Sequence, residues 1–245
     1  MKKSENIFIL WYQGKTSMPE LVRLCYNSVL KNSNGHRVVL LDSSSIFDWI
    51  DPFPEKVQQK FDNNIFSLQL KSDLIRLSLL KQYGGLWLDA TVFVSKKIPD
   101  EVFKMPFFTV IRKEAEKEDI SGKISPFLLG RNINNENSQK LFNFSQELMM
   151  EYIEQEDDLI NYLLIENILN IGINNDKVIN KLIDNLYKNK KDILGLEKSL
   201  NNVYESDVLK ILLENNLFSK LNFHTSHFKR NENNKLTNYG KLFQI

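Results

Sequence analysis

The chain has little cysteine and no long apolar run. Cys25 is its only cysteine, which excludes a disulfide framework and a thiolate metal site. Its place among apolar helix positions favours a small buried residue over a nucleophile. The apolar run at residues 7–12 is followed by Gln13, so it is too short to span a bilayer and makes a poor signal peptide. We therefore expect a protein of the reducing cytoplasm.

A surplus of charge of one sign is also missing. Lysine and arginine number 32 and the acidic residues 31, so the formal net charge is +1. With no global field and no arginine-rich or RNP-like pattern, we do not expect a nucleic-acid partner. A chain of 245 residues is long enough to bury a full core, and we expect residues 1–245 to form one domain.

Strand and helix patterns alternate in the first half and predict an α/β fold. The run at residues 7–12 predicts a strand, and the S-M-P-E segment at residues 17–20 predicts a capping box that opens a helix. Residues 37–41 predict a second strand, and strand-helix-strand is typical of a parallel sheet. Helical spacing dominates after Asn135. Further elements are expected at residues 55–61 (helix), 107–111 and 126–130 (strands), and 141–152, 157–172, 178–186 and 208–213 (helices).

A helix, a turn and a strand lie between Lys71 and Val94 and carry the densest group of polar candidates. The helix is apolar nearly all round, which predicts that it is buried. Ser67 is placed to cap its start. Gly84 and Gly85 end it, because glycine accepts the left-handed conformation of a C-cap.

Three charged side chains stand in this apolar block. Asp73 and Arg76 are three residues apart, so they share one face of the helix. Asp89 interrupts a strand that is apolar on both faces, and Thr91 shares its face. Charges in such a setting are costly unless something binds them, and ligands of open α/β sheets bind at the carboxyl ends of strands. The structural alternative is an Asp73–Arg76 ion pair, with Asp89 capping a turn.

These residues resemble the bacterial capsular polysaccharide synthesis glycosyltransferases, which are relatives of the DXD-containing sugar transferases (glycosyltransferase family 32-like). The most specific segment is K-S-D-L-I-R-L-S-L-L-K-Q-Y-G-G-L-W-L-D-A-T-V-F-V, from Lys71 to Val94. Weaker segments in family order are I-L-W-Y-Q-G, M-P-E-L-V-R-L-C-Y-N-S-V, V-V-L-L-D, D-D-L-I-N-Y-L-L-I-E and N-K-L-T-N-Y-G-K-L.

The resemblance implies the GT-A fold, a Rossmann-like nucleotide-binding sheet flanked by helices, here with a helical C-terminal half. Residues 1–135 would form the part that binds the nucleotide sugar. Residues 136–245 would form a mainly helical part on the acceptor side.

The resemblance also implies site residues. Asp89 stands at the first acid of the DXD motif, and Thr91 stands where the second acid would be. A Mn²⁺ or Mg²⁺ ion is implied, with Asp89, Thr91 and His224 as candidate ligands. The implied donor-binding residues are Trp11, Tyr12, Gln13, Asp73, Arg76, Gly84, Gly85, Asp89, Ala90 and Thr91.

The implied catalytic residues are Asp89, Arg76 and Asp158. A departing diphosphate gathers negative charge, which a guanidinium offsets through its fork of donors. A nearby carboxylate supports an oxocarbenium-like sugar, as in glycoside hydrolysis. Asp158 either reaches the cleft or only caps a helix, and His224 and His227 are either ligands or exposed loop residues.

Three functions compete at this stage. The first is a cytoplasmic glycosyltransferase that moves a sugar from a nucleotide-sugar donor, a UDP-sugar, to a capsular or other surface polysaccharide repeat unit. Its acceptor would be a lipid-linked oligosaccharide, reached by peripheral contact with the inner face of the plasma membrane. The second is a non-catalytic protein that binds a nucleotide sugar or glycan and has lost the second acid. The third is a helical interaction module over residues 136–220, which leaves the charged block unexplained.

Overall fold

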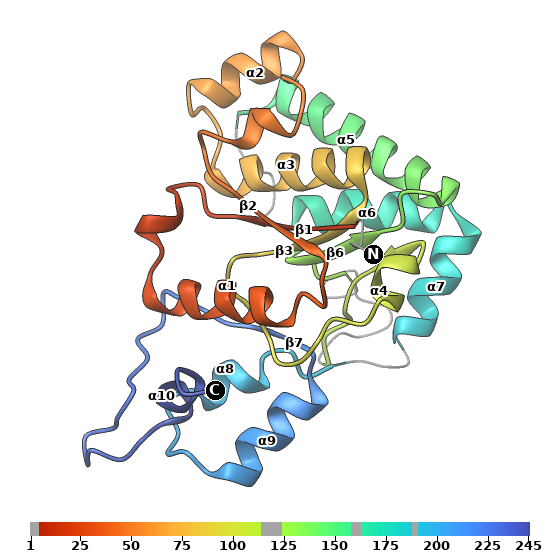
Figure 1. Cartoon of the computed structure of the whole chain (residues 1–245). Helices are drawn as coiled ribbons and strands as arrows, with labels where there is room; N and C mark the ends of the chain where they lie inside the picture. Colours follow the sequence, from red (N-terminus) through yellow and green to blue (C-terminus); the bar gives the residue numbers. More distant parts are fainter. Residues whose placement is uncertain (1–4, 114–123, 158–162, 188–190) are drawn as a thin grey trace.

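A five-stranded mixed sheet with strand order β2-β1-β3-β6-β5 organises the computed structural model, which describes residues 5–113, 124–157, 163–187 and 191–245 (Figure 1). β1 runs parallel to both β2 and β3, whereas β6 runs antiparallel to β3 and β5. The predicted α/β class is therefore confirmed. The strands are β1 (Asn6–Leu10), β2 (Arg37–Leu41), β3 (Gly85–Leu88), β5 (Phe107–Phe108) and β6 (Leu128–Arg131).

The opening strand-helix-strand unit forms as the sequence predicts. Helix α1 (Glu20–Asn32) connects the parallel strands β1 and β2. The predicted capping box is wrong, because the N-cap is Pro19, whose apolar side chain cannot accept a hydrogen bond. The Ser17 hydroxyl instead lies in a short 3₁₀ turn, η1 (Lys15–Ser17), and donates to the Gly14 carbonyl at 2.8 Å.

The chain between Gly85 and Val94 is two strands and not the single strand predicted. β3 ends at Leu88, the chain turns, and β4 (Val92–Val94) then pairs with β7 (Phe218–Lys220) in a separate two-stranded sheet. The Val92 amide donates to the Asp89 carbonyl at 2.9 Å and closes that turn. Asp89 therefore lies immediately beyond the carboxyl end of β3.

Helix α3 (Leu68–Tyr83) is buried along most of its length, as its apolar surface predicts. The Ser67 hydroxyl accepts the Leu70 amide at 3.2 Å, so the predicted N-cap is confirmed. The helix ends at Gly84, whose φ is +62°. Helix α5 (Glu136–Gln155) packs on the far side of α3 and shields it from solvent (Figure 1).

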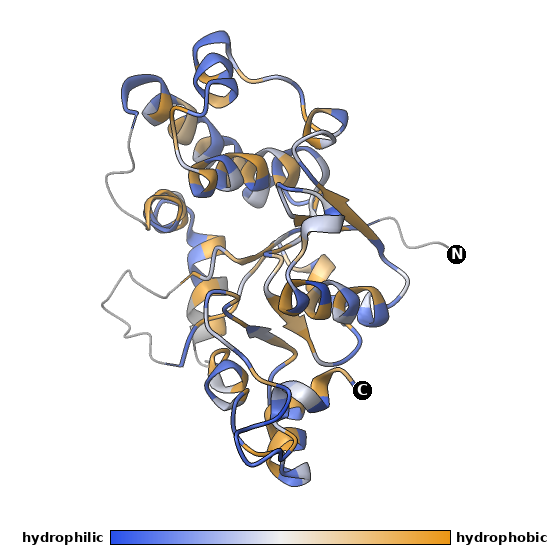
Figure 2. Cartoon of the chain, turned by 90° about the vertical axis from the view of Figure 1, so that its left-hand side faces the viewer, coloured by the Kyte–Doolittle hydropathy of each residue, from blue (hydrophilic) through white to orange (hydrophobic). Residues whose placement is uncertain are grey.

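Alternate residues of β1 pack into two hydrophobic cores, one on each face of the sheet. Phe8 points into the core shared with α3, while Ile7 points into the core shared with α1. In Figure 2 the strands of the central sheet are mainly hydrophobic, which agrees with a sheet covered on both faces.

The second half is mainly helical, as expected, but it also supplies β7. The strands predicted at 107–111 and 126–130 are shorter or shifted and correspond to β5 and β6. No helix in the described part of the chain is long and apolar enough to cross a membrane. The remaining helices are η2 (Ile46–Asp48), α2 (Glu55–Asp62), α4 (Glu101–Lys104), α6 (Leu164–Asn174), α7 (Lys177–Tyr187), α8 (Gly195–Ser199), α9 (Ser206–Asn215) and α10 (Asn238–Leu242).

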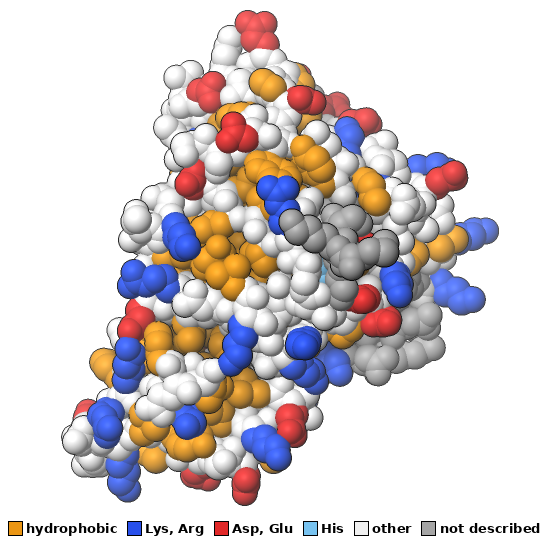
Figure 3. Space-filling model, in the orientation of Figure 1, with side chains coloured by type: hydrophobic (Ala, Val, Ile, Leu, Met, Phe, Trp, Pro, Cys, Tyr) orange, Lys and Arg blue, Asp and Glu red, His pale blue; other side chains and the backbone are white. Residues whose placement is uncertain are grey.

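The surface reflects the near-neutral charge. Figure 3 shows acidic and basic side chains spread over much of this face, with hydrophobic side chains exposed between them. The charged groups that could bind a ligand must therefore be sought at a local site.

Candidate functional site

A cavity of about 420 Å³ opens where β1 and β3 end. The two strands are parallel, so their carboxyl ends meet at one edge of the sheet, the usual place for a ligand in an α/β fold. The volume lies in the range of small-molecule sites. The cavity is lined by Leu10, Trp11, Tyr12, Gln13, Leu68, Gln69, Ser72, Asp73, Arg76, Trp87, Asp89, Ala90, Thr91, Pro126, Phe127, Leu163, Ile165, Lys220 and Phe223.

The Asp89 carboxylate lies between two cations. Its Oδ2 accepts a hydrogen bond from Lys220 Nζ at 2.8 Å, and its Oδ1 lies 3.3 Å from Arg76 Nη2. The Trp87 indole also donates to Oδ1 at 2.9 Å. Burial acts to raise the pKa of Asp89, but Lys220, Arg76 and these hydrogen bonds outweigh it and hold the pKa well below its usual range. Asp89 is therefore ionised at neutral pH.

Arg76 is held by contacts on several sides. Its Nη2 lies 3.2 Å from Asp73 Oδ1, and its Nη1 donates to the Pro126 carbonyl at 2.5 Å. Nη2 also donates to the Ser72 hydroxyl at 3.2 Å, and the guanidinium lies 5.1 Å from the centre of the Trp87 ring. These contacts fix the plane of the guanidinium beside the cavity.

Asp73 is the member of the charged cluster whose hydrogen-bonding capacity is least satisfied by the described residues. Its side chain is 3% exposed, and its Oδ2 has no hydrogen-bond partner among the described residues. Burial raises the pKa of Asp73 to about 7, with Asp89 adding to the shift and Arg76 opposing it. A buried oxygen without a partner is costly, so a ligand hydroxyl would satisfy it.

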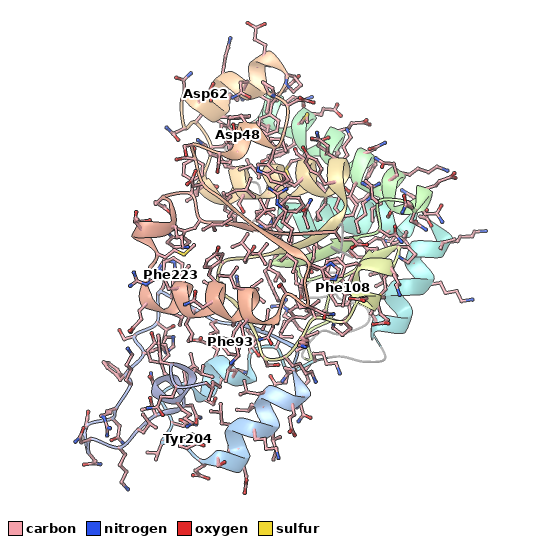
Figure 4. All side chains as sticks on the ribbon, in the orientation of Figure 1. Asp48, Asp62, Phe93, Phe108, Tyr204 and Phe223 are labelled. Carbon is pink, nitrogen blue, oxygen red and sulfur yellow. The ribbon has the colours of Figure 1, made fainter. Side chains whose placement is uncertain are left out.

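Aromatic side chains form another wall of the cavity. The Trp11 ring stands edge-on to Phe223 at 5.5 Å, and its indole donates to Ser17 at 3.0 Å. In Figure 4, Phe223 lies on the segment after β7 that passes beside the loop following β1. The Tyr12 hydroxyl lies 3.5 Å from Lys71 Nζ, which is itself buried. Flat apolar surface of this kind suits a nucleobase or a sugar ring.

The cavity gathers most of the residues that the resemblance implies. The eight that line it are Trp11, Tyr12, Gln13, Asp73, Arg76, Asp89, Ala90 and Thr91.

Gly84 and Gly85 do not line the cavity, contrary to the role expected for them. They lie at the opposite, amino end of β3. A Cβ on Gly85 would lie 2.3 Å from the Asn6 carbonyl oxygen, and one on Gly84 would lie 2.9 Å from the Arg131 carbonyl oxygen. Close backbone approach is therefore the physical reason for glycine at both positions.

The remaining candidates lie elsewhere. Asp158 falls outside the described residues. His224 is exposed and does not line the cavity, and its ring packs on Phe223 at 4.0 Å. His227 Nε2 lies 3.0 Å from the Asn222 carbonyl and 3.4 Å from Glu197 Oε1.

Sequence reasoning missed Lys220. It lies in the short L-F-S-K-L segment at 217–221, which shows no regular alternation of apolar and polar residues. Nothing in that pattern names β4 as the pairing partner, yet the pairing is what sets Lys220 opposite Val92 and brings it to Asp89.

The described residues offer few ligands for a divalent metal ion. No group of three or more His, Cys, Asp or Glu side chains comes together within the parts of the chain that the structure describes. Mn²⁺ and Mg²⁺ take hard oxygen ligands, chiefly carboxylates. Lys220 lies on one oxygen of Asp89, Arg76 and Trp87 lie on the other, and Thr91 brings no charge. The donor set therefore does not fit the ion that the resemblance implies.

Comparison with known proteins places the chain in a family. It is 33% identical over 108 residues to the O-glycosyltransferase braB of Annulohypoxylon truncatum, a match that covers 39% of this chain and 25% of that protein. The solved structure of PaToxG Glycosyltransferase aligns with a TM-score of 0.46 at 18% identity, over 76% of this chain and 75% of that chain. The family model described as capsular polysaccharide synthesis protein matches residues 1–242. The chain therefore belongs to the capsular polysaccharide synthesis protein family.

Proposed function

We propose that the protein is a glycosyltransferase that moves a sugar from a nucleotide-sugar donor, a UDP-sugar, to a growing surface polysaccharide. The observation that carries this proposal is the position of Arg76, held between Asp73 and Asp89 at the edge of the cavity. Membership of the capsular polysaccharide synthesis protein family and the partial likeness to an O-glycosyltransferase support it.

The donor would lie along the cavity from its aromatic wall to its charged cluster. Trp11 and Tyr12 would border the base, and Gln13 beside them offers amide hydrogen bonds. The unpartnered Oδ2 of Asp73 would accept a hydroxyl of the ribose or the donor sugar. Arg76 would attract the diphosphate through its charge, and the Nη1 donor that does not bind the Pro126 carbonyl would donate to a phosphate oxygen.

The proposed reaction exchanges one bond to the anomeric carbon for another. The bond from that carbon to the diphosphate oxygen breaks, and its electron pair stays on the diphosphate. An acceptor hydroxyl oxygen forms the new bond, and its proton passes to the leaving diphosphate or to solvent. Arg76 offsets the charge that grows on the diphosphate, and the ionised Asp89 carboxylate offsets positive charge on the sugar.

The acceptor proposed is a lipid-linked oligosaccharide, the precursor of a capsular repeat unit, reached by peripheral contact with a membrane. Apolar residues at the cavity wall, Leu163, Ile165 and Phe223, offer surface to it. All three come from residues 136–245, the part proposed for the acceptor side. The role proposed for Asp158 is to contact donor or acceptor from the same part.

The second candidate function is binding of a nucleotide sugar or glycan without turnover. Thr91 favours it, because a threonine stands where the DXD motif has a second carboxylate. The two candidates differ in one measurable respect: both predict that UDP or a UDP-sugar binds, but only the first predicts release of UDP from the donor.

A donor screen tests the proposal. Purified protein is mixed with UDP- and GDP-sugars, with Mn²⁺ or with EDTA, and thermal midpoint and nucleotide release are recorded. We expect at least one donor to raise the midpoint, because a ligand bound only by the folded state stabilises it by mass action. We expect the same donor to be hydrolysed slowly without acceptor. If no donor binds under either condition, the proposal is wrong, and binding without release would favour the second candidate.

A further inference from the structure

We propose that Lys220 is a donor-binding cation that stands in for a divalent metal ion at the diphosphate, so that donor binding requires no metal. This role for Lys220 rests on the proposed function and goes beyond it by assigning a new residue and removing a cofactor.

The backbone holds Lys220 firmly at the cavity. Its amide donates to the Ile193 carbonyl at 2.9 Å, and its strand pairs with β4. The Leu221 amide donates to the Thr91 carbonyl, also at 2.9 Å. The side chain then passes beside the Phe127 ring, with Nζ 5.2 Å from the ring centre, and ends on Asp89. The ammonium is thus placed by two strands and an aromatic ring.

The charges balance without a metal. A divalent ion held by two carboxylates forms a locally neutral unit. Here Thr91 contributes no charge, and Asp89 with Lys220 forms a neutral unit of one carboxylate and one ammonium. A divalent ion placed on Asp89 would meet Lys220 and Arg76 at close range, where like charges repel strongly. The present donor set therefore favours ammonium over metal.

Lys220 retains capacity for a ligand. An ammonium has three donors, and within the described residues Lys220 Nζ makes one hydrogen bond, to Asp89 Oδ2. The side chain is 26% exposed and lines the cavity, so a phosphate oxygen can approach it from the open side. Arg76 lies on the other oxygen of Asp89. The two cations therefore flank one carboxylate and together can hold the two phosphates of a nucleoside diphosphate.

Calorimetry with UDP and GDP on the full chain tests the inference. Each nucleotide is titrated into the wild type, Lys220→Met and Lys220→Arg, with EDTA or with Mn²⁺. Lys235→Met is the matched control, because Lys235 is exposed and does not line the cavity. Thermal midpoints confirm that each variant is folded.

We expect the wild-type Kd in EDTA to lie within about 2-fold of its value in Mn²⁺. Lys220→Met should weaken binding by about 10-fold or more, since a charge-assisted hydrogen bond is lost. Lys220→Arg should recover part of the affinity, and Lys235→Met should bind as the wild type does.

Two outcomes would overturn the inference while leaving the proposed function intact. One is a wild type that binds nucleotide with Mn²⁺ and fails to bind it in EDTA. The other is a folded Lys220→Met variant with wild-type affinity. Absence of binding by either nucleotide under both conditions would instead reject the proposed function, and the inference with it.

Discussion

Lys220 Nζ lies 2.8 Å from Asp89 Oδ2, although 131 positions separate the two residues in the chain. The pair joins the turn after β3 to the last residue of β7 and closes one side of the cavity. It also explains how a carboxylate in an apolar block stays ionised: the cations around it offset the cost of burial.

Removing the charge of Asp89 should disable the site. Asp89→Asn keeps the size of the side chain but leaves Arg76 and Lys220 without their shared anion. We expect transfer or donor hydrolysis to fall by about 100-fold, a loss typical of a missing charged group at a reacting centre. The free energy of unfolding should fall by about 1–3 kcal/mol.

Steady-state kinetics and urea unfolding measure the two effects. Asp51→Asn, at an exposed position, is the control and should change neither. Wild-type activity in folded Asp89→Asn would assign Asp89 a purely structural role.

Arg76 should not tolerate lysine. Arg76→Lys keeps the charge but removes the fork that reaches Pro126 and Asp73 together. We expect nucleotide affinity, measured by calorimetry, to fall about 10-fold, which corresponds to about 1.4 kcal/mol. Arg23→Lys is the matched control, because Arg23 is exposed on α1. Unchanged affinity in Arg76→Lys would mean that Arg76 serves only the ion pair with Asp73.

Asp73 should make stability depend on pH. Burial raises its pKa to about 7 in the folded protein, from 3.8 in the unfolded chain. The folded state therefore binds the proton more tightly, and stability falls as pH rises from about 4 to about 7, then levels off. A tenfold difference in proton affinity between the two states corresponds to about 1.4 kcal/mol, so a pKa change of about three units should cost on the order of 4 kcal/mol over the whole window.

Asp73→Asn removes this titration. As pH rises through that window, the wild type should lose stability and Asp73→Asn should not, so the variant becomes the more stable relative to wild type. Urea unfolding at pH 5, 6, 7 and 8 measures the two free energies. Asp89 has the opposite sign, and its contribution is lost only at much lower pH. A difference that stays constant across the window would show that Asp73 is ionised throughout.

Two glycines with positive φ, one crowded and one with open space around it, offer a stability test that is separate from donor binding. Gly85 has φ +87° and no room for a Cβ, whereas Gly35 has φ +84° and open space around it. Gly35→Ala should cost about 1 kcal/mol from backbone strain alone. Gly85→Ala should cost about 3 kcal/mol or more, because the Cβ would also clash with the Asn6 carbonyl.

Calorimetry on the folded fraction of Gly85→Ala then tests its role. We expect wild-type nucleotide affinity, because Gly85 lies at the far end of β3 from the cavity. A loss of affinity without a loss of stability would restore Gly85 as a donor-binding residue.

The local sequence determined much of the fold and part of the site. The Ser67 cap, the strand at Arg37–Leu41 and the Asp73–Arg76 pair follow from spacing within a few residues. Such features depend on neighbours along the chain, so a single sequence reveals them. The same reasoning placed Asp89 inside a single strand, near the crevice where α/β sheets bind ligands.

Only the tertiary structure decided that the strand breaks at Asp89, that β4 pairs with β7 and that Lys220 contacts Asp89. It also separated Gly84 and Gly85 from the site. Strand pairing depends on hydrogen bonds between backbone segments that are distant in sequence. Many short apolar segments could pair with β4 equally well, so the sequence does not name the partner. The place of Lys220 beside Asp89 was therefore set by packing between distant segments, while Arg76 and the Asp89 carboxylate could be found from the sequence.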